Sequence, residues 1–262
     1  DPDAVYLASQ LSLRLMCYDR ASGKRLYEAD LFRVTRPDPV HRWNSYATPT
    51  PVVEPGRVYC DFGTYGTGCV ESETGRILWQ CSLPADHLIG PASSPALCRQ
   101  RLVLVRDGAD VQYVAALNTR TGQTVWRRER PPIRAETGNE KKAFSTPLVI
   151  ECDGRLQVVV PGAHWICAYD PETGQELWRV RHGRNFSLAP RPVYGYGLVY
   201  CCTGCPVSEL WAIRPTGQGD VTQTHVVWRA KGSIPSMSSP IIVGAELYCV
   251  SDNGIITCFD AA

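Results

Sequence analysis

Side chains of the types used for proton transfer, metal binding and ligand recognition gather in five short segments. The segments are HRWNSYATPT (41–50), ADHLIGPASS (85–94), EKKAFSTP (140–147), GAHW (162–165) and APRP (189–192). Imidazole and carboxylate groups transfer protons, carboxylate and amide oxygens bind calcium, and cationic groups bind anions. The candidate site residues are His41, Asn44, Tyr46, Asp86, His87, Lys142, His164 and Arg191, with Lys141 beside Lys142.

Twelve cysteines form the second chemically capable set, with an adjacent pair at Cys201 and Cys202 and a Cys-x-x-Cys spacing from Cys202 to Cys205. Adjacent side chains of a strand point to opposite faces, so a vicinal disulfide ring would disrupt an extended strand. A lone Cys-x-x-Cys lacks the second ligand pair of a zinc site. We therefore interpret most thiols as small buried apolar side chains. A functional vicinal disulfide ring and a zinc site are the less favoured alternatives. The number of unpaired thiols weakly favours a reducing compartment.

Composition predicts a folded chain and excludes two classes of partner. The 262 residues are 44% hydrophobic, and 27 basic against 26 acidic residues give a net charge of +1. No basic tract is present that would neutralise a phosphate backbone, so nucleic acid is not an expected partner. No apolar run approaches the length of about 18 residues that a transmembrane helix needs. The first residues, DPDAVYLASQ, do not read as a signal peptide.

An internal repeat organises the whole sequence. One phrase recurs as CVESETGRILW (69–79), ALNTRTGQTVW (116–126) and AYDPETGQELW (168–178), in a pattern with a period of about 48 residues. Each copy has a small and then a large apolar residue, a polar anchor, a Thr-Gly pair and an aromatic residue. The anchors are Asp19, Glu71, Asn118, Asp170, Arg214 and Asp260. The fifth copy departs from the rule, with Gly217 one place early and Trp228 displaced by an insertion.

Each period holds four short runs with the composition of β-strands. In the fourth copy these are STPLVI (145–150), LQVVV (156–160), WICAYD (165–170) and QELWRV (175–180). The anchor and the Thr-Gly pair suit a tight hairpin, and the aromatic residue is expected to pack the outer strand against the neighbouring sheet. Four-stranded antiparallel sheets repeated around an axis make a β-propeller. The fold class predicted is therefore all-β, a propeller of about six repeats in one domain spanning 1–262.

The repeats are expected at about 1–34, 45–83, 92–130, 144–182, 188–231 and 236–262, with a proline opening most inner strands, as in TPVV (50–53) and SPII (239–242). The first repeat begins at a second-strand run, and the last ends before its Thr-Gly turn. We therefore expect incomplete first and last blades, in a segment of a larger ring or an open arc. Unpaired edges of such blades carry a risk of self-association.

On these spacings the chain resembles the PQQ-like repeat propellers, which comprise quinoprotein dehydrogenases and non-enzymatic relatives. The resemblance implies relatives that commonly have eight blades, and it suggests the cell envelope, although the location of this chain stays unassigned. For an enzyme it implies pyrroloquinoline quinone (PQQ) on a tryptophan floor, a calcium site of Glu, Asn and Asp side chains, and an aspartate base. Asp86 and Asn44 are the residues of suitable type, but the full set cannot be mapped onto this sequence.

Two functions of different class follow. The first is a non-enzymatic scaffold that binds a protein partner and no cofactor, and the second is a fragment of a PQQ- and calcium-dependent oxidoreductase. Most of the candidate segments precede an inner strand, so their side chains are expected near one face of the ring as a binding mouth. The alternative is that they line a water-filled channel and cap backbone groups. We favour the scaffold, because no nucleophile elbow, phosphate loop or metalloprotease motif occurs.

Overall fold

The computed structural model describes residues 4–9 and 13–262, and these are almost entirely β-structure. The first sheet holds β1 (Ala4–Ser9), β2 (Arg14–Asp19) and β3 (Arg25–Asp30); the second holds β4 (Val52–Glu54), β5 (Arg57–Asp61), β6 (Thr67–Glu71) and β7 (Ile77–Cys81); the third holds β8 (Ala96–Cys98), β9 (Arg101–Asp107), β10 (Gln112–Asn118) and β11 (Thr124–Glu129).

The later sheets follow the same plan. The fourth holds β12 (Leu148–Cys152), β13 (Arg155–Pro161), β14 (Trp165–Tyr169), β15 (Glu176–Arg181) and β19 (Gly219–Asp220); the fifth holds β16 (Val193–Gly195), β17 (Leu198–Cys202), β18 (Leu210–Ile213) and β20 (Val226–Ala230); the sixth holds β21 (Ile241–Val243), β22 (Glu246–Val250) and β23 (Ile256–Asp260).

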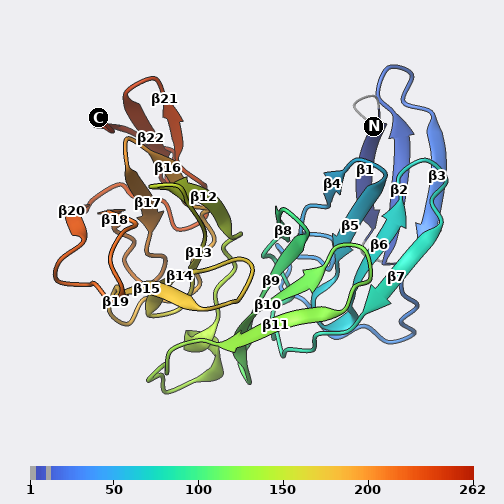
Figure 1. Cartoon of the computed structure of the whole chain (residues 1–262), viewed down its shortest axis with the longest axis horizontal. Coiled ribbons are helices and arrows are strands. Elements are labelled where there is room, and N and C mark those ends of the chain that lie inside the picture. The colour runs from blue at the N-terminus through green and yellow to red at the C-terminus, as the bar shows by residue number, and fades with distance from the viewer. Residues whose placement is uncertain (1–3, 10–12) are drawn as a thin grey trace.

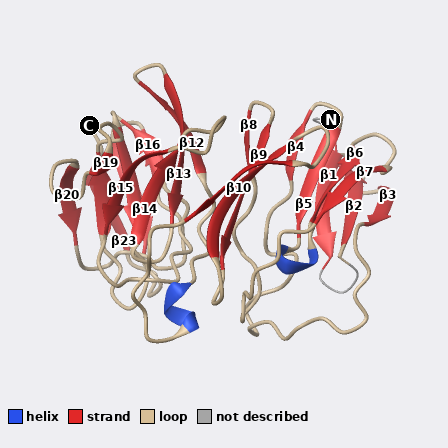
Figure 2. Cartoon of the chain, turned by 60° about the horizontal axis from the view of Figure 1, so that its bottom comes forward, coloured by secondary structure: helices blue, strands red, loops and turns tan. Residues whose placement is uncertain are grey.

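The six sheets succeed one another around a curved arc, with the two termini at its ends (Figure 1). The first sheet has no strand ahead of β1, and the last has none beyond β23, among the residues that the structure describes. The long connecting loops and the short helices η1 (Gly63–Tyr65) and η2 (Gly138–Lys141) lie on one side of the sheets, which we call the loop face (Figure 2). The predicted fold class, with incomplete first and last blades, is confirmed.

The repeated phrase forms the predicted hairpin. The Asn118 carboxamide Oδ1 accepts the backbone N–H groups of Arg120 and Thr121, and the Asp170 carboxylate accepts those of Glu172 and Thr173. The glycine that closes the turn has a positive φ, for example +69° at Gly174. This conformation is costly for residues with a Cβ, which explains why glycine recurs there.

In the first three sheets, the aromatic residue after the Gly turn docks on the turn of the next sheet. The Nε1 atoms of Trp79 and Trp126 donate to the carbonyl oxygens of Thr119 and Pro171, each at 2.9 Å, and the Tyr27 hydroxyl donates to the Ser72 carbonyl at 2.8 Å. Each acceptor directly follows the anchor of its own repeat. The expected contact between neighbouring sheets is therefore confirmed, and a buried hydrogen bond fixes its register.

The fourth and fifth sheets use a relay in place of this direct bond. The Trp178 Nε1 atom donates to Gln157 Oε1 at 2.7 Å, and Gln157 Nε2 donates to the Pro215 carbonyl at 2.8 Å. The insertion of the fifth repeat supplies β19, which pairs in parallel with β15. The fourth sheet is thus five-stranded, which corrects the expectation of four strands in every complete repeat.

Five apolar clusters make up the core, and each lies between two consecutive sheets. Leu15 packs with Val58 between the first and second sheets, for example, and Tyr200 packs with Leu247 between the fifth and sixth. Cys201 and Cys202 belong to the clusters on opposite faces of the fifth sheet. Sheet-to-sheet packing therefore holds the arc together, because burial of apolar area is the main favourable term in folding.

Candidate binding face

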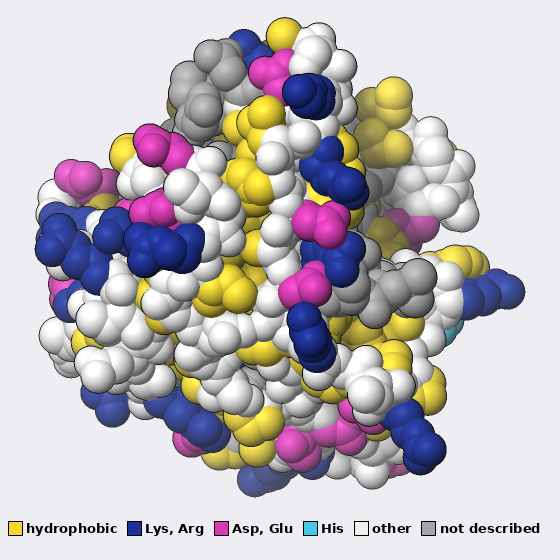
Figure 3. Space-filling model, turned by 90° about the vertical axis from the view of Figure 1, so that its right-hand side faces the viewer, with side chains coloured by type: hydrophobic (Ala, Val, Ile, Leu, Met, Phe, Trp, Pro, Cys, Tyr) yellow, Lys and Arg dark blue, Asp and Glu magenta, His cyan; other side chains and the backbone are white. Residues whose placement is uncertain are grey.

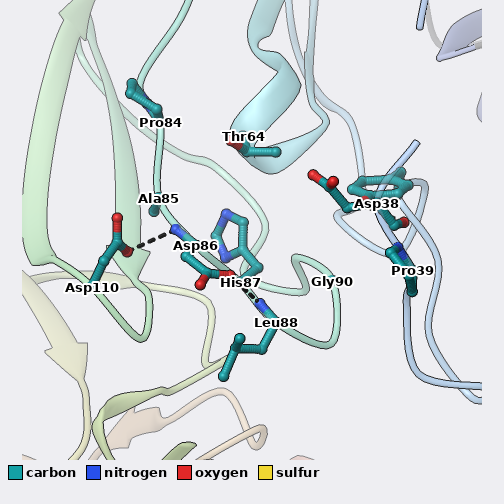
Figure 4. Close-up of a pocket in the computed structure, with 11 residues that line it drawn as sticks. Asp38, Pro39, Thr64, Pro84, Ala85, Asp86, His87, Leu88, Gly90 and Asp110 are labelled. Atoms are coloured by element: carbon teal, nitrogen blue, oxygen red, sulfur yellow. Dashed lines mark hydrogen bonds between the residues drawn. The ribbon is translucent and has the colours of Figure 1, made fainter. Parts of the chain in front are cut away.

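A cavity of about 550 Å³ opens between loops of the first three sheets. We call it the aspartate cavity, because Asp38, Asp86 and Asp110 line it together with Tyr46 and His87. Asp110 and Asp38 lie at opposite sides, with Asp86 and His87 between them (Figure 4). The structure thus brings three of the sequence-predicted residues, Tyr46, Asp86 and His87, into one site.

The carboxylates of the aspartate cavity are held by donors of the chain itself. Asp110 Oδ1 accepts the Asp86 backbone N–H at 2.7 Å, and Asp86 Oδ1 accepts the Leu88 N–H at 2.9 Å. Asp38 Oδ2 accepts the Tyr65 hydroxyl at 3.2 Å. These bonds order the loops and leave the three side chains spread around the opening.

His87 lines the aspartate cavity, and Lys142 lies near enough for its charge to act on His87. Burial and the Arg106 charge lower the pKa of His87 to about 3, so the imidazole is neutral at pH 7. Lys142 is fully buried, and its Nζ has no hydrogen-bond partner within the described part of the chain. Burial lowers the pKa of Lys142, while the charge of Asp86 opposes that shift. The neutral imidazole of His87 therefore adds no positive charge to the aspartate cavity at pH 7.

The loop before β4 carries the other predicted residues of this region. Asn44 Nδ2 donates to the Ile89 carbonyl at 2.8 Å, which ties the loop to the segment after His87. His41 is exposed and meets Trp43 edge to face, with ring centroids 5.3 Å apart. Trp43 is 77% exposed, and the Arg42 guanidinium lies 4.7 Å above its ring. Our sequence reasoning did not select Trp43, although it lies within a segment that we quoted.

The structure places His164 and Arg191 away from the aspartate cavity. His164 is buried, its φ is +66°, and its backbone N–H donates to the Asn185 carbonyl. Burial, with the charges of Arg181 and Arg184, lowers its pKa. Arg191 lines a separate cavity between the inner strands of the last three sheets. The predicted residues therefore do not form a single site, because neither His164 nor Arg191 lines the aspartate cavity.

Two buried ion pairs escaped the sequence reasoning. Arg106 on β9 donates to Asp61 on β5 through Nη1 and Nη2, at 3.0 and 2.6 Å. Arg130 Nε lies 3.3 Å from Asp107 Oδ1, and burial raises the pKa of Asp107 to about 6. Charged residues at the ends of otherwise apolar second strands were the available signal. The first pair joins the second and third sheets, and the second pair lies within the third sheet, between β9 and the residue that follows β11. None of these four residues lines the aspartate cavity.

The cysteines behave largely as predicted. None of the twelve, all of which lie in the described part of the chain, forms a disulfide bond, and nine of them are buried. Cys258 on β23 is exposed, because the equivalent Cys69 packs against the sheet that follows its own, whereas no sheet follows β23 among the described residues. Cys202 and Cys249, from different sheets, interact directly through their side chains, a contact that the repeat alignment did not predict.

The residues present do not fit a calcium–quinone site of the dehydrogenase type. Among the residues that the structure describes, no group of three or more His, Cys, Asp or Glu side chains is arranged to hold a metal ion. The carboxylates of the aspartate cavity accept hydrogen bonds from backbone N–H groups or from a tyrosine hydroxyl. Calcium, in contrast, needs six to eight oxygen ligands that converge on one point. Trp79, Trp126 and Trp178 belong to the clusters between sheets, and none of them lines the aspartate cavity.

Comparison with known proteins gives relatives of both classes. A family model described as "Outer membrane protein assembly factor BamB" matches residues 14–262. The quinohemoprotein alcohol dehydrogenase ADH-IIG of Pseudomonas putida is 25% identical over 228 residues, which is 75% of this chain and 30% of that protein. No helix among the described residues has the length and apolar character to span a membrane.

Solved structures agree on the fold. BamB from Moraxella catarrhalis superposes with a TM-score of 0.61 at 15% identity, over 98% of this chain and 67% of that one. Quinohemoprotein alcohol dehydrogenase from Comamonas testosteroni superposes with a TM-score of 0.51 at 11% identity, over 99% of this chain and 64% of that one. The chain spans about 30% of the length of its curated relative. With the family model covering residues 14–262, the chain belongs to the PQQ-like propeller family that the model describes as outer membrane protein assembly factor BamB.

Proposed function

We propose that this chain is a non-enzymatic scaffold that binds a partner protein through its loop face and uses no cofactor. The observation that carries the proposal is Trp43, which is 77% exposed and stacked with Arg42 on a loop of this face. Exposed tryptophan is uncommon on a soluble protein surface, and Trp and Arg are the residue types enriched at the energetic centres of protein interfaces. The family description as an assembly factor supports the same assignment.

The runner-up function is a PQQ- and calcium-dependent oxidoreductase. It is favoured by the similarity to a quinohemoprotein alcohol dehydrogenase and by a cavity of about 550 Å³ lined by three aspartates. The engagement of those carboxylates by donors of the chain argues against it, since calcium would have to displace the hydrogen bonds that order the loops.

A ligand titration distinguishes the two functions. The purified chain is titrated with PQQ and Ca²⁺ together, and the melting temperature and the quinone absorbance are recorded, with a quinoprotein dehydrogenase as positive control. A specific ligand stabilises the folded state by mass action, by about 2.7 kcal/mol at a hundred times its Kd. The scaffold proposal predicts no shift for this chain. A saturable rise in melting temperature would overturn it.

A second experiment tests protein binding directly. A photo-crosslinking amino acid replaces Trp43 on the loop face or Val227 on the outer strand β20, both of which are exposed. The Trp43 position is expected to trap one defined protein, and the Val227 position is expected not to trap it. Equal trapping at both positions, or none at either, would contradict the proposed interface.

A further inference from the structure

Arg191 breaks a rule that the other inner strands obey. The residue before the proline that opens the inner strand is a short hydroxyl residue at Thr50, Ser94, Thr146 and Ser239, but it is Arg191 in the fifth repeat. The side-chain hydroxyl of this serine or threonine accepts a hydrogen bond from the backbone N–H of the equivalent residue in the preceding sheet. Ser94 Oγ accepts from Thr50, Thr146 Oγ1 from Ser94, and Ser239 Oγ from Arg191 itself, at 2.9–3.1 Å.

The Arg191 side chain has no role in that chain of hydrogen bonds. Arg191 is exposed, and in the described structure its guanidinium makes no ion pair or hydrogen bond. The backbone N–H of Arg191 already satisfies the link to Ser239, which a serine at this position would also make. The arginine therefore adds an uncompensated charge without stabilising the sheet contact.

The cavity beside Arg191, which we call the inner groove, is otherwise mostly apolar. It has a volume of about 540 Å³, and its apolar wall includes Leu148, Val193, Tyr194, Ile241 and Ile242. Ile241 is 58% exposed. The inner groove is bounded by β16 and β21, and each of these strands pairs with only one other strand of the described sheets. One free cation beside exposed apolar side chains and unpaired strand edges suits an extended peptide.

We propose that the inner groove binds an extended segment of a partner protein that carries an acidic side chain between apolar ones. The carboxylate of that segment pairs with Arg191, and its apolar side chains contact Tyr194 and Ile241. The charge complementarity is specific to this position, since Thr50, Ser94, Thr146 and Ser239 place neutral hydroxyls at the equivalent sites. This inference rests on the proposed scaffold function and gives the chemistry of one partner segment.

Calorimetric titration with a defined probe tests the inference. The probe is acetyl-Val-Glu-Val-Ile-amide, and the matched control peptide has Gln in place of Glu. The glutamate peptide is expected to bind about fivefold more tightly than the glutamine peptide, as one partly exposed ion pair allows. Arg191→Ser is expected to abolish that difference, and Arg120→Ser, at an exposed turn of the third sheet, to preserve it.

Ile241→Ser is expected to weaken both peptides, because it removes part of the apolar wall. Arg191→Ser restores the residue type of the equivalent positions, so its melting temperature is expected to match that of the parent chain. Equal affinity of the parent chain for the two peptides, or no binding of either, would overturn the inference. That outcome, with PQQ and Ca²⁺ leaving the melting temperature unchanged, would reject the inner groove alone, whereas stabilisation by PQQ would reject the scaffold.

Discussion

At the scale of single residues, the buried pair of Arg106 and Asp61 connects two consecutive sheets. Arg106 on β9 reaches Asp61 on β5 and also donates from Nε to the Leu83 carbonyl at 2.8 Å. The side chains of Arg106 and Asp61 are each 1% exposed. Thr67 supplies a further hydrogen bond to the Asp61 carboxylate. The charges of Arg106 and Asp61 therefore compensate each other, as burial in a region of low dielectric requires.

Removing one partner of this pair is expected to cost more than removing both. Arg106→Met leaves the Asp61 carboxylate buried without its cation, and we expect a loss of about 3–5 kcal/mol in the free energy of unfolding. The double variant Arg106→Met, Asp61→Leu should recover most of that loss. Urea denaturation of the two variants makes the comparison. A double variant no more stable than the single one would show that the ion pair is not the source of the effect.

His182 is expected to make the chain sensitive to acid. Its Nε2 lies 2.9 Å from the Gly162 carbonyl, and burial lowers its pKa to about 4. An unfolded histidine has a pKa of about 6.5, so between pH 6.5 and 4 the unfolded chain binds the proton that the native chain excludes. Stability therefore falls as the pH falls through this window. Between pH 7 and 5 this one group accounts for about 2 kcal/mol.

The variant His182→Gln keeps a hydrogen-bond donor for Gly162 but cannot titrate. Urea denaturation at pH 7 and pH 5 should show a smaller loss of stability on acidification than in the parent chain. His87, whose pKa is lowered to about 3, stays in both proteins and contributes equally to each. An unchanged difference between the two pH values would contradict the assignment to His182.

At the scale of elements, the glycine turn and the aromatic residue of the preceding sheet form one unit. A Cβ built on Gly174 would lie 2.5 Å from the Trp126 ring, and one on Gly122 would lie 2.5 Å from Trp79. The glycine thus serves twice, since it adopts a positive φ and it lets the indole approach the turn. The turn of the first repeat, at Gly23, has the same conformation but no neighbour within 4 Å of such a Cβ.

This difference supplies a matched pair of variants. Gly23→Ala is expected to cost about 1–2 kcal/mol, the strain of a positive φ alone. Gly174→Ala should cost about 1–3 kcal/mol more than Gly23→Ala, because Trp126 must move to admit the methyl group. Thermal or urea denaturation of both variants measures the difference. Equal losses would mean that the aromatic contact tolerates the added atom.

At the scale of the whole molecule, the two ends of the arc present different surfaces. On β2 and β3, Arg14 pairs with Glu28 and Asp30, and Arg25 pairs with Glu28. Figure 3 shows this side of the molecule, with basic and acidic side chains alternating in a row beside an apolar strip. The last sheet exposes apolar side chains instead, with Ile256 68% exposed on β23. Charges discourage pairing between strand edges, whereas exposed apolar strands promote it.

The chain is therefore expected to self-associate through its last sheet. Sedimentation velocity over a concentration series should show a rising average mass for the parent chain. Ile256→Lys should suppress this rise, and Leu26→Lys on β3, also at an exposed apolar side chain, should not. A parent chain that stays monomeric over the whole series would contradict the prediction, as would equal suppression by the two variants.

The sequence by itself determined the repeated sheet, its hairpin and its contact with the next sheet. A period of about 48 residues contains the alternating strands, the glycine that adopts a positive φ and the aromatic donor, so each is encoded within one copy. The incomplete first and last sheets followed from the same alignment. Tyr46, Asp86 and His87 line one cavity, whereas the sequence predicted only that they lie near one face, at the entrances of the inner strands.

Only the tertiary structure decided which loops meet. The loops differ in length and sequence from repeat to repeat, so the periodic pattern does not fix where their side chains point. Packing between sheets places Asp38 and Asp86 in one cavity and Arg191 in another, and it buries Lys142. The tertiary structure likewise pairs β19, which the insertion forms, with β15 of the preceding sheet. Contacts between residues far apart in the sequence set these features, such as those of Asn44 with Ile89 and of Asp86 with Asp110, and local sequence preferences do not encode them.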